Sequence, residues 1–240
     1  MKKKIKSTGV IFGDMHFPLH DESAFSCALK VIEKVKPDIF INLGDFAEGE
    51  YVSHWRWSRR KRPPLEYQLP LIDKEAEEVN MHMDRIDYAL KKVGCKNKYL
   101  AMGNHDNWYN AFVEENPYLD KYKPETLFNV EKRGYKWFPY GEIFKVEDSK
   151  LYAYHGGHYG SVNHSRATVQ NWGCNRIYGH THDCQRSVVQ HISGVHSAQS
   201  MGCLCKMKKD FLKGRKVNWT HNVGIVDFFD DGWFNLITLD

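Results

Sequence analysis

The sequence lacks any long apolar run. None of its stretches approaches the roughly 20 consecutive apolar residues that a membrane-spanning helix requires. The lysines of the opening "MKKKIK" are followed by "STGVIFGD", which has neither the apolar core nor the cleavage site of a secretory signal. We therefore predict a protein that does not enter a membrane and that is cytoplasmic.

Cysteine is scarce and scattered. The 240 residues include six cysteines, namely Cys27, Cys95, Cys174, Cys184, Cys203 and Cys205. So few thiols in a chain of this size are typical of a reducing compartment and argue against a disulfide framework. Cys203 and Cys205 form a C-x-C pair, but no second pair lies at zinc-site spacing, so we expect ordinary cysteines of a strand or loop.

A strong net charge is also missing. Lys and Arg number 34, and Asp and Glu number 30, which leaves a net charge of +4. The excess is concentrated in "MKKKIK" and in residues 56–62 and 205–216. Such local runs are compatible with a polyanionic partner such as DNA or RNA, although each run by itself is more typical of a solvated surface.

The sequence does contain five short apolar runs with a common ending. Each ends with Gly beside Asp, Asn or His: "GVIFGD", "DIFINLGD", "KYLAMGN", "LYAYHGG" and "NRIYGHTH". Runs of this length, rich in β-branched and aromatic residues, predict strands. Helical patterns over residues 21–36 and 73–94 separate the first three runs. The alternation therefore predicts parallel strands whose carboxyl ends share one sheet edge.

The last part of the chain follows a different pattern. Apolar and polar residues alternate in "RSVVQHISGVHSAQSMG", "VGIVDFF" and "GWFNLITLD", with the turn signals "SG" and "DDG" between runs, which predicts antiparallel strands. We therefore expect an α/β fold, a four-layer α/β/β/α sandwich of two mixed sheets flanked by helices. Residues 1–240 are expected to form a single domain. Within it, residues 52–72, which include "VSHWRWSRRKRPP", are expected to form a basic and aromatic insertion loop.

Polar side chains at the predicted strand ends should meet in space. They belong to Asp14, His16, Asp45, Asn104, His105, His155, His180 and His182. Their oxygen and imidazole donors suit Mn²⁺, with Fe or Zn²⁺ as alternatives, better than Mg²⁺ or Ca²⁺. The set is too large for one ion, which predicts two divalent ions that share Asp45 and clamp a phosphoryl group. A hydroxide held between the two ions would be the nucleophile.

Five blocks occur in order from Asp14 to His182: "D-x-H", "G-D", "G-N-H-D", "H-G" and "G-H-x-H". Together they resemble the calcineurin-like metallophosphoesterase superfamily and cover most of the chain. The resemblance implies a first ion held by Asp14, His16, Asp45 and His182, and a second held by Asp45, Asn104, His155 and His180. It also implies that His105 protonates the leaving-group oxygen or contacts the phosphate, with Asp106 orienting its imidazole.

Some of these residues have other interpretations. Asp14 alone is typical of a helix cap, and Asn104 with Asp106 is typical of a turn. His158 competes with His155, which we prefer because its H-G directly follows a strand; His158 then lines the substrate pocket or lies on the surface. The remaining histidines match no motif and are treated as non-ligands: His20, His54, His82, His164, His191, His196 and His221.

The insertion and the exact sequences of two motif blocks indicate which substrates are favoured. Because the insertion follows Asp45 closely, we expect Trp55, Arg56 and Trp57 to influence substrate choice and residues 59–62 to be more exposed. "GDFAEGE" and "GNHD" differ from the "GDxVDRG" and "GNHE" of protein Ser/Thr phosphatases, which disfavours that subgroup.

Three functional interpretations remain, in this order. The first is a phosphodiesterase that acts on nucleic acid or nucleotides, favoured by the basic and aromatic runs. The second is a small-molecule phosphomonoesterase or nucleotide hydrolase, with the insertion as a lid. The third is a non-catalytic scaffold, as in the retromer subunit with this fold, which the complete ligand set disfavours.

Overall fold

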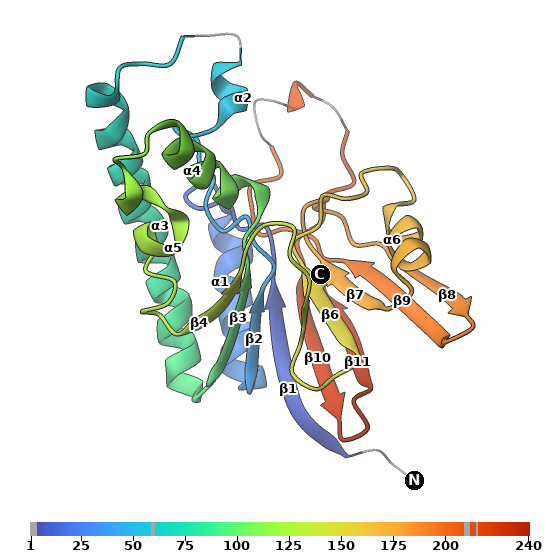
Figure 1. Ribbon diagram of the computed structural model, residues 1–240. Coiled ribbons are helices and arrows are strands. Elements are labelled where there is room, and N and C mark those ends of the chain that lie inside the picture. Colours follow the sequence, from blue (N-terminus) through green and yellow to red (C-terminus); the bar gives the residue numbers. More distant parts are fainter. Residues whose placement is uncertain (1–3, 59–60, 209–211, 215) are drawn as a thin grey trace.

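Two β-sheets form the centre of the protein. The computed structural model describes residues 4–58, 61–208, 212–214 and 216–240. The first sheet has the order β11-β10-β1-β2-β3-β4, and the second has the order β5-β6-β7-β9-β8 (Figure 1). The strands of the first are β1 (Ile5–Phe12), β2 (Ile39–Asn42), β3 (Asn97–Ala101), β4 (Tyr135–Phe138), β10 (Val223–Phe229) and β11 (Phe234–Leu239). Those of the second are β5 (Phe144–Lys145), β6 (Leu151–Tyr154), β7 (Asn175–Tyr178), β8 (Arg186–His191) and β9 (Gly194–Ser200).

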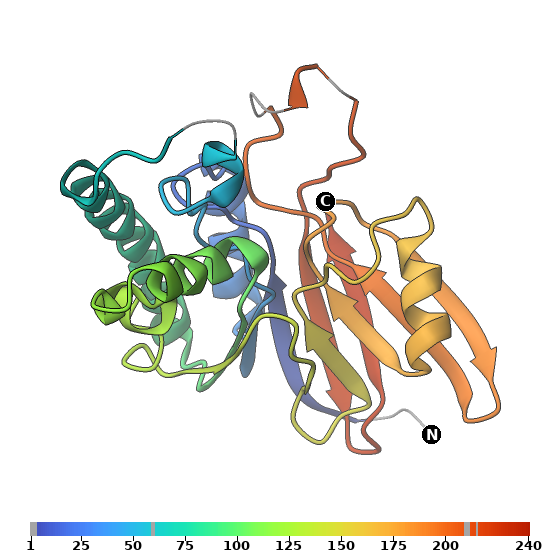
Figure 2. The same ribbon diagram turned by 45° about the horizontal axis from the view of Figure 1, so that its top comes forward.

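Helices cover the outer faces of both sheets. They are α1 (Glu22–Val35), α2 (His54–Trp57), α3 (Leu65–Val93), α4 (Asn104–Glu115), the 3-10 turn η1 (Asp120–Tyr122), α5 (Pro124–Leu127) and α6 (His164–Trp172). Figures 1 and 2 show α1, α3 and α4 on one side of the sheets and α6 on the other. Within the described part of the chain, no helix combines the length and apolar character that a membrane span requires.

Three groups of buried side chains hold the layers together. The two sheets face each other through apolar residues such as Ile41 of β2 and Ile177 of β7. The outer face of the first sheet packs against α1 and α3, with Phe25 and Met83 in the shared core. The outer face of the second sheet packs against Val169 of α6. The predicted four-layer α/β/β/α sandwich is therefore confirmed.

Strand pairing determines at which end of the sandwich the predicted ligands lie, and we call this end the functional edge. β1, β2, β3 and β4 are parallel, and Ile41 of β2 lies opposite Ile11 of β1 and Tyr99 of β3. β6 and β7 are also parallel. The carboxyl ends of these strands consequently lie at one end of the sandwich. The pairs β8–β9 and β10–β11 are antiparallel, as the alternating pattern predicts.

The predicted helix over residues 21–36 is confirmed as α1. The Asp21 carboxylate caps its start by accepting a hydrogen bond of 3.0 Å from the Ala24 N–H. Lys36, just before Pro37, ends the helix in the left-handed conformation with a φ of 51°. Phe25, Ala28 and Ile32 are buried at helical spacing and fix the face that α1 turns to the sheet.

The second predicted helix begins earlier than expected. α3 begins at Leu65 rather than at Asp73, so the irregular part of the insertion is shorter than residues 52–72, and it includes the short helix α2. Pro70 lies inside α3, and its presence led the sequence pattern to place the start too late. Gln68 and Ile72 continue the buried stripe of α3, and the Gln68 Nε2 donates 2.7 Å to the Tyr51 carbonyl. This burial stabilises the early turns despite the proline.

A buried carboxyl group ties α3 to the insertion. Glu75 accepts hydrogen bonds from the Glu50 N–H at 3.0 Å and from the Tyr109 hydroxyl at 3.1 Å. Burial, together with the nearby charge of Glu48, raises the pKa of Glu75 to about 8. Because the folded pKa lies above the unfolded one, the folded state binds the extra proton between these two values.

We expect this carboxyl group to make folding pH-dependent. Its stabilising contribution is fully present below its unfolded pKa near 4.5 and is lost as pH rises through about 8. Glu75→Gln should flatten the fall in unfolding free energy between pH 5 and pH 8 by roughly 2–4 kcal/mol. Urea denaturation at both pH values measures this, with the exposed Glu66→Gln as control. Parallel pH profiles for Glu75→Gln and the unchanged protein would contradict it.

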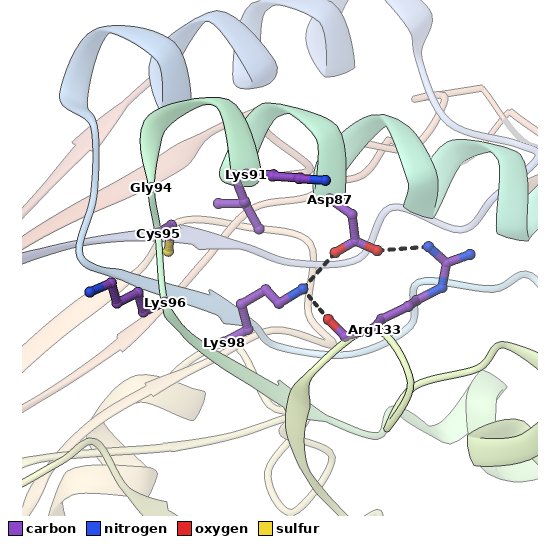
Figure 3. A pocket seen from close by; sticks show the side chains of 8 residues that line it. Asp87, Lys91, Gly94, Cys95, Lys96, Lys98 and Arg133 are labelled. Carbon is purple, nitrogen blue, oxygen red and sulfur yellow. Dashed lines mark hydrogen bonds and ion pairs between the residues drawn. The ribbon is translucent and has the colours of Figure 1, made fainter.

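A cavity of about 460 Å³ lies at the opposite end of β3 from the functional edge (Figure 3). Its lining includes Asp87, Lys98 and Arg133. The Asp87 carboxylate contacts the Lys98 Nζ at 2.9 Å and a guanidinium nitrogen of Arg133 at 2.7 Å. These two cations are thus paired in partly buried surroundings, and we interpret the cluster as a structural link between α3, β3 and the segment before β4.

Candidate metal centre

All predicted metal ligands follow parallel strands. The first sheet supplies Asp14 and His16 after β1, Asp45 after β2 and Asn104 after β3. The second sheet supplies His155 after β6, and His180 and His182 after β7. Both sheets therefore contribute donors to the same end of the sandwich.

The donors gather into two groups that share one carboxylate. Asp14, His16, Asp45 and His182 offer ligand atoms that all lie within 4.8 Å of one another. Asp45, His155 and His180 form a second group within the same limit. The Asn104 Oδ1 adjoins the second group, 3.1 Å from the His155 Nε2 and 2.8 Å from the His180 Nδ1. The two groups match the two ligand sets that the family resemblance implies.

The ligand backbone is unusual. Asp14, His16, Asp45, His180 and His182 have φ values from 47° to 69°, in the left-handed region that side chains disfavour by about 1–2 kcal/mol per residue. Hydrogen bonds between the loops hold this conformation: the Asp14 N–H donates to Gly44 at 3.1 Å, and the His16 N–H donates to Asp45 at 2.8 Å. Backbone strain of this kind concentrates at functional sites.

Two glycines leave room for the carboxylates. A Cβ atom at Gly103 would overlap the Asp45 carboxylate, and a Cβ atom at Gly179 would overlap that of Asp14. These steric limits explain why glycine precedes the ligand in the "GN" and "GH" blocks.

In three histidines, the ring nitrogen that faces away from the centre has a possible acceptor beside it. The His16 Nδ1 lies 2.9 Å from the Glu48 carboxylate, and the His155 Nδ1 donates 2.7 Å to the Leu43 carbonyl. The His182 Nδ1 lies 3.9 Å from the Cys205 sulfur. A metal-binding histidine usually donates its second ring N–H to such a partner, which fixes the tautomer and the ring orientation.

The inner atoms of these ligands then face one another at short distance. The His155 Nε2 lies 3.3 Å from an Asp45 oxygen, and the His16 Nε2 lies 3.1 Å from the His182 Nε2. With the outer nitrogens protonated, these inner positions present lone pairs that repel each other unless a cation or an added proton lies among them. In the polypeptide alone, burial would lower the pKa of His155, but the Asp45 charge outweighs burial and raises it to about 9. The donor set therefore fits divalent metal ions.

His105 lies beside the first group. Its backbone N–H donates 2.8 Å to Asp45, and its Nδ1 donates 2.6 Å to the Glu48 carbonyl. Its ring contacts that of His16 edge-on, with the centroids 4.5 Å apart. Burial lowers the pKa of His105 to about 4 in the polypeptide alone. Because Nδ1 holds its proton against the Glu48 carbonyl, the Nε2 of the neutral ring has a lone pair and must take up a proton before it can give one.

Asp106 differs from its expected role. Its carboxylate accepts hydrogen bonds from the Gly103 N–H at 2.8 Å and the Ala47 N–H at 3.1 Å. The ring nitrogen of His105 is instead held by the Glu48 carbonyl. Because Asp106 lies within the first turn of α4, its carboxylate turns back to the helix start. Asp106 therefore joins the loops after β2 and β3 rather than orienting His105.

The predicted substrate residues lie in different surroundings. Arg56 forms an ion pair with Glu50, and the Trp57 indole N–H donates 3.4 Å to the Tyr51 carbonyl, so both are held by their own segment. Trp55 is 70% exposed. His158 is exposed, with its ring 5.7 Å from that of Trp172 on α6.

The structure describes only part of the basic run at residues 59–62. Of residues 59–62, Arg59 and Arg60 lie outside the described residues. Lys61 is exposed, whereas Arg62 forms an ion pair with Glu115. The expected exposure therefore holds for Lys61 but not for Arg62, whose charge is matched by a carboxylate.

Sequence reasoning missed two residues that support the metal ligands. Glu48 contacts His16 through its side chain and His105 through its carbonyl. In the sequence "GDFAEGE", the only signal for this role is that Glu48 lies close to Asp45. Cys205, which we expected to be an ordinary cysteine, is fully buried against His182. The C-x-C spacing could not reveal this contact because the two residues lie far apart in sequence.

A further histidine cluster lies beside α1 and α3. His20, Glu22 and His82 bring possible ligand atoms within 4.8 Å of one another. However, the Arg85 guanidinium donates 2.9 Å to Glu22 and lies 3.2 Å from the His82 Nδ1. A permanent cation among these donors disfavours a metal ion at this cluster.

Comparison with known proteins identifies the class to which this fold and site belong. The model of the calcineurin-like phosphoesterase family matches residues 10–193, a span that contains every predicted ligand. The chain belongs to the calcineurin-like phosphoesterase family. No curated protein sequence matches it.

Solved structures with a similar fold include both named phosphoesterases and sorting proteins. Vacuolar protein sorting 29 of Cryptosporidium parvum is 13% identical, with a TM-score of 0.49 and 98% of each chain covered. The phosphoesterase YfcE of E. coli is 14% identical, with a TM-score of 0.44 and coverage of 97% of this chain and 100% of that one. Vps29 of Chaetomium thermophilum is 7% identical, with a TM-score of 0.45 and 97% and 96% coverage.

Proposed function

We propose that this protein is a dinuclear metal-dependent phosphodiesterase that acts on nucleic acid or nucleotides. The observation that carries the proposal is the pair of donor groups that share Asp45. Asp14, His16, Asp45 and His182 would hold one ion, and Asp45, Asn104, His155 and His180 the other. Mn²⁺ suits this mixture of carboxylate, amide and imidazole donors, with Fe or Zn²⁺ as alternatives.

The residues of the chain have separate tasks in this proposal. When bound, two ions supply Lewis acidity and activate water near neutral pH. Asp45 would hold both ions, and Glu48, Leu43 and Cys205 would orient the histidine ligands. His105 stands beside the centre with its Nε2 unpartnered among the described contacts. There it would contact the phosphate or, once Nε2 has taken up a proton, give that proton to the leaving oxygen.

The three candidate functions require different residues around the metal centre. Exposed Trp55 near the site favours a substrate with a base over a small phosphomonoester. A monoesterase that uses the insertion as a lid is the second candidate. A non-catalytic scaffold is the third, and the gathered donors weigh against it because a scaffold has no need of them.

Hydrolysis assays with the Mn²⁺-loaded protein separate these candidates. We expect cleavage of bis-p-nitrophenyl phosphate to exceed that of p-nitrophenyl phosphate, and metal removal with a chelator to abolish both. Single- and double-stranded DNA form the remaining arms of the comparison. A preference for the monoester would favour the second candidate, and no hydrolysis with any of Mn²⁺, Fe²⁺ or Zn²⁺ would favour the scaffold.

A further inference from the structure

A row of aromatic rings leads from the metal centre to the surface. The His105 ring lies 3.9 Å from that of Trp108, centroid to centroid, at an angle of 36°. Trp108 in turn contacts His54 at 5.8 Å, and His54 contacts Trp55 at 5.2 Å. We call His105, Trp108, His54 and Trp55 the aromatic row. It joins α4, which begins at the metal ligand Asn104, to α2 of the insertion.

The local structure holds the inner rings, His105 and Trp108, in place and exposes the outer rings, His54 and Trp55. Trp108 lies one helical turn after His105, so both side chains share a face of α4. Gly49 lies against the Trp108 ring: a Cβ atom there would come within 3.3 Å of it. Trp108 is half-buried, whereas His54 and Trp55 are exposed. The row therefore presents ring surface to solvent next to the centre.

Two cations near the same segment are paired with carboxylates, unlike the exposed aromatic rings. Arg56 pairs with Glu50, and Arg62 pairs with Glu115. A groove that follows a polynucleotide backbone presents cations to phosphates. Among the described cations around α2, Arg56 and Arg62 are paired and only Lys61 is exposed without an ion pair in the described contacts, while Trp55 is 70% exposed. This part of the insertion is consequently better suited to stacking on a base than to gripping a chain of phosphates.

We propose that Trp108, His54 and Trp55 form a stacking surface for the nucleobase on the leaving-group side of the phosphoester. The inference rests on the proposed function and assigns its specificity to these three residues. A base is recognised here by its flat π-face, which stacks on an aromatic side chain for about 1–3 kcal/mol. Contact with His105 places the surface beside the residue that faces the leaving oxygen.

Two ligands that differ only in the base test this surface. Adenosine 5′-monophosphate and ribose 5-phosphate share the sugar and the phosphate, so calorimetry with the Mn²⁺-loaded protein isolates the contribution of adenine. We expect Trp55→Ala and Trp108→Ala each to raise the Kd of the nucleotide about tenfold. The Kd of ribose 5-phosphate should change less than about twofold. Trp108→Phe, which keeps a ring, should restore most of the affinity for the nucleotide.

The control is an exposed tryptophan at the other end of the sandwich. Trp233 lies in the turn between β10 and β11, and Trp233→Ala should leave both Kd values unchanged. Equal affinity of the unchanged protein for the two ligands, or equal weakening of both by Trp55→Ala, would overturn the stacking surface while leaving the proposed function intact. If the unchanged protein binds neither ligand and hydrolyses no phosphoester, the proposed function fails and this inference fails with it.

A longer ligand identifies the source of the base. A ten-residue deoxyadenylate that binds more tightly than the mononucleotide, and that loses affinity in Trp55→Ala, supports stacking of a polynucleotide. Equal affinity, with the same loss, supports stacking of a free nucleotide. An oligonucleotide that binds tightly but is unaffected by both tryptophan substitutions would contradict the proposal.

Discussion

Asp45→Asn is expected to remove hydrolysis almost completely. Asn has nearly the same shape and can still accept the His105 N–H, but it lacks the negative charge that two cations share. Burial would raise the pKa of Asp45, yet the charge of His155 holds it well below its usual range, so the native group is a carboxylate. Losing an ion removes several kcal/mol of transition-state stabilisation. We therefore expect kcat/KM to fall ~10³-fold or more.

Metal content provides a second measure of this substitution. Elemental analysis after dialysis should show that Asp45→Asn loses metal from both groups, whereas a change at a ligand of one group, such as His180→Ala, should mainly affect one. Asp120→Asn is the matched control, because Asp120 is 71% exposed and pairs only with Lys123 among the described contacts. Retention of one fully occupied site together with near-normal activity would show that Asp45 does not bridge.

His105→Ala should affect substrates according to their leaving group. A poor leaving group, such as the sugar oxygen of a dinucleotide, needs a proton as the bond to phosphorus breaks, whereas p-nitrophenolate does not. Loss of a general acid costs about 10²–10⁴-fold. We expect a loss of that size for the dinucleotide and a much smaller one for bis-p-nitrophenyl phosphate, measured as kcat.

The comparison has a close control on the same helix. Asn110→Ala changes a polar residue of α4 that bonds only to Asn107 among the described contacts, and both substrates should be cleaved at the normal rate. Equal losses on the two substrates in His105→Ala would remove the general-acid role. His105 would then be a phosphate contact, which the family resemblance also allows.

Much of the fold could be predicted from the sequence because local signals agreed with the tertiary structure. Short runs of β-branched and aromatic residues ended at glycine, and α1 had both a capping aspartate and a stop before Pro37. The predicted ends of these strands and of α1 were therefore nearly right. α3 was misjudged at its start because Pro70 is a strong local signal for a helix end. The burial of Gln68 and Ile72 depends on residues elsewhere in the chain, which no local pattern contains.

The sequence predicted which donor side chains gather at the strand ends, but not the residues that contact them. Ligands recur in short blocks at strand ends, and parallel pairing brings such ends together. Glu48, Cys205 and Trp108 act through contacts with His16, His182 and His105, which the fold alone creates. The role of Asp106 was misassigned for the same reason: adjacency to His105 in sequence says nothing about where a helix turns its side chains.

The left-handed backbone at five ligands has a consequence for engineering. Glycine adopts that conformation without the steric penalty of a side chain, so replacement of Asp14 or His182 by glycine would relax the loop while deleting a donor. Selection for heat resistance alone would therefore favour glycine at positions whose side chains the centre needs. A useful library for this protein would keep these five codons fixed and seek its gains elsewhere.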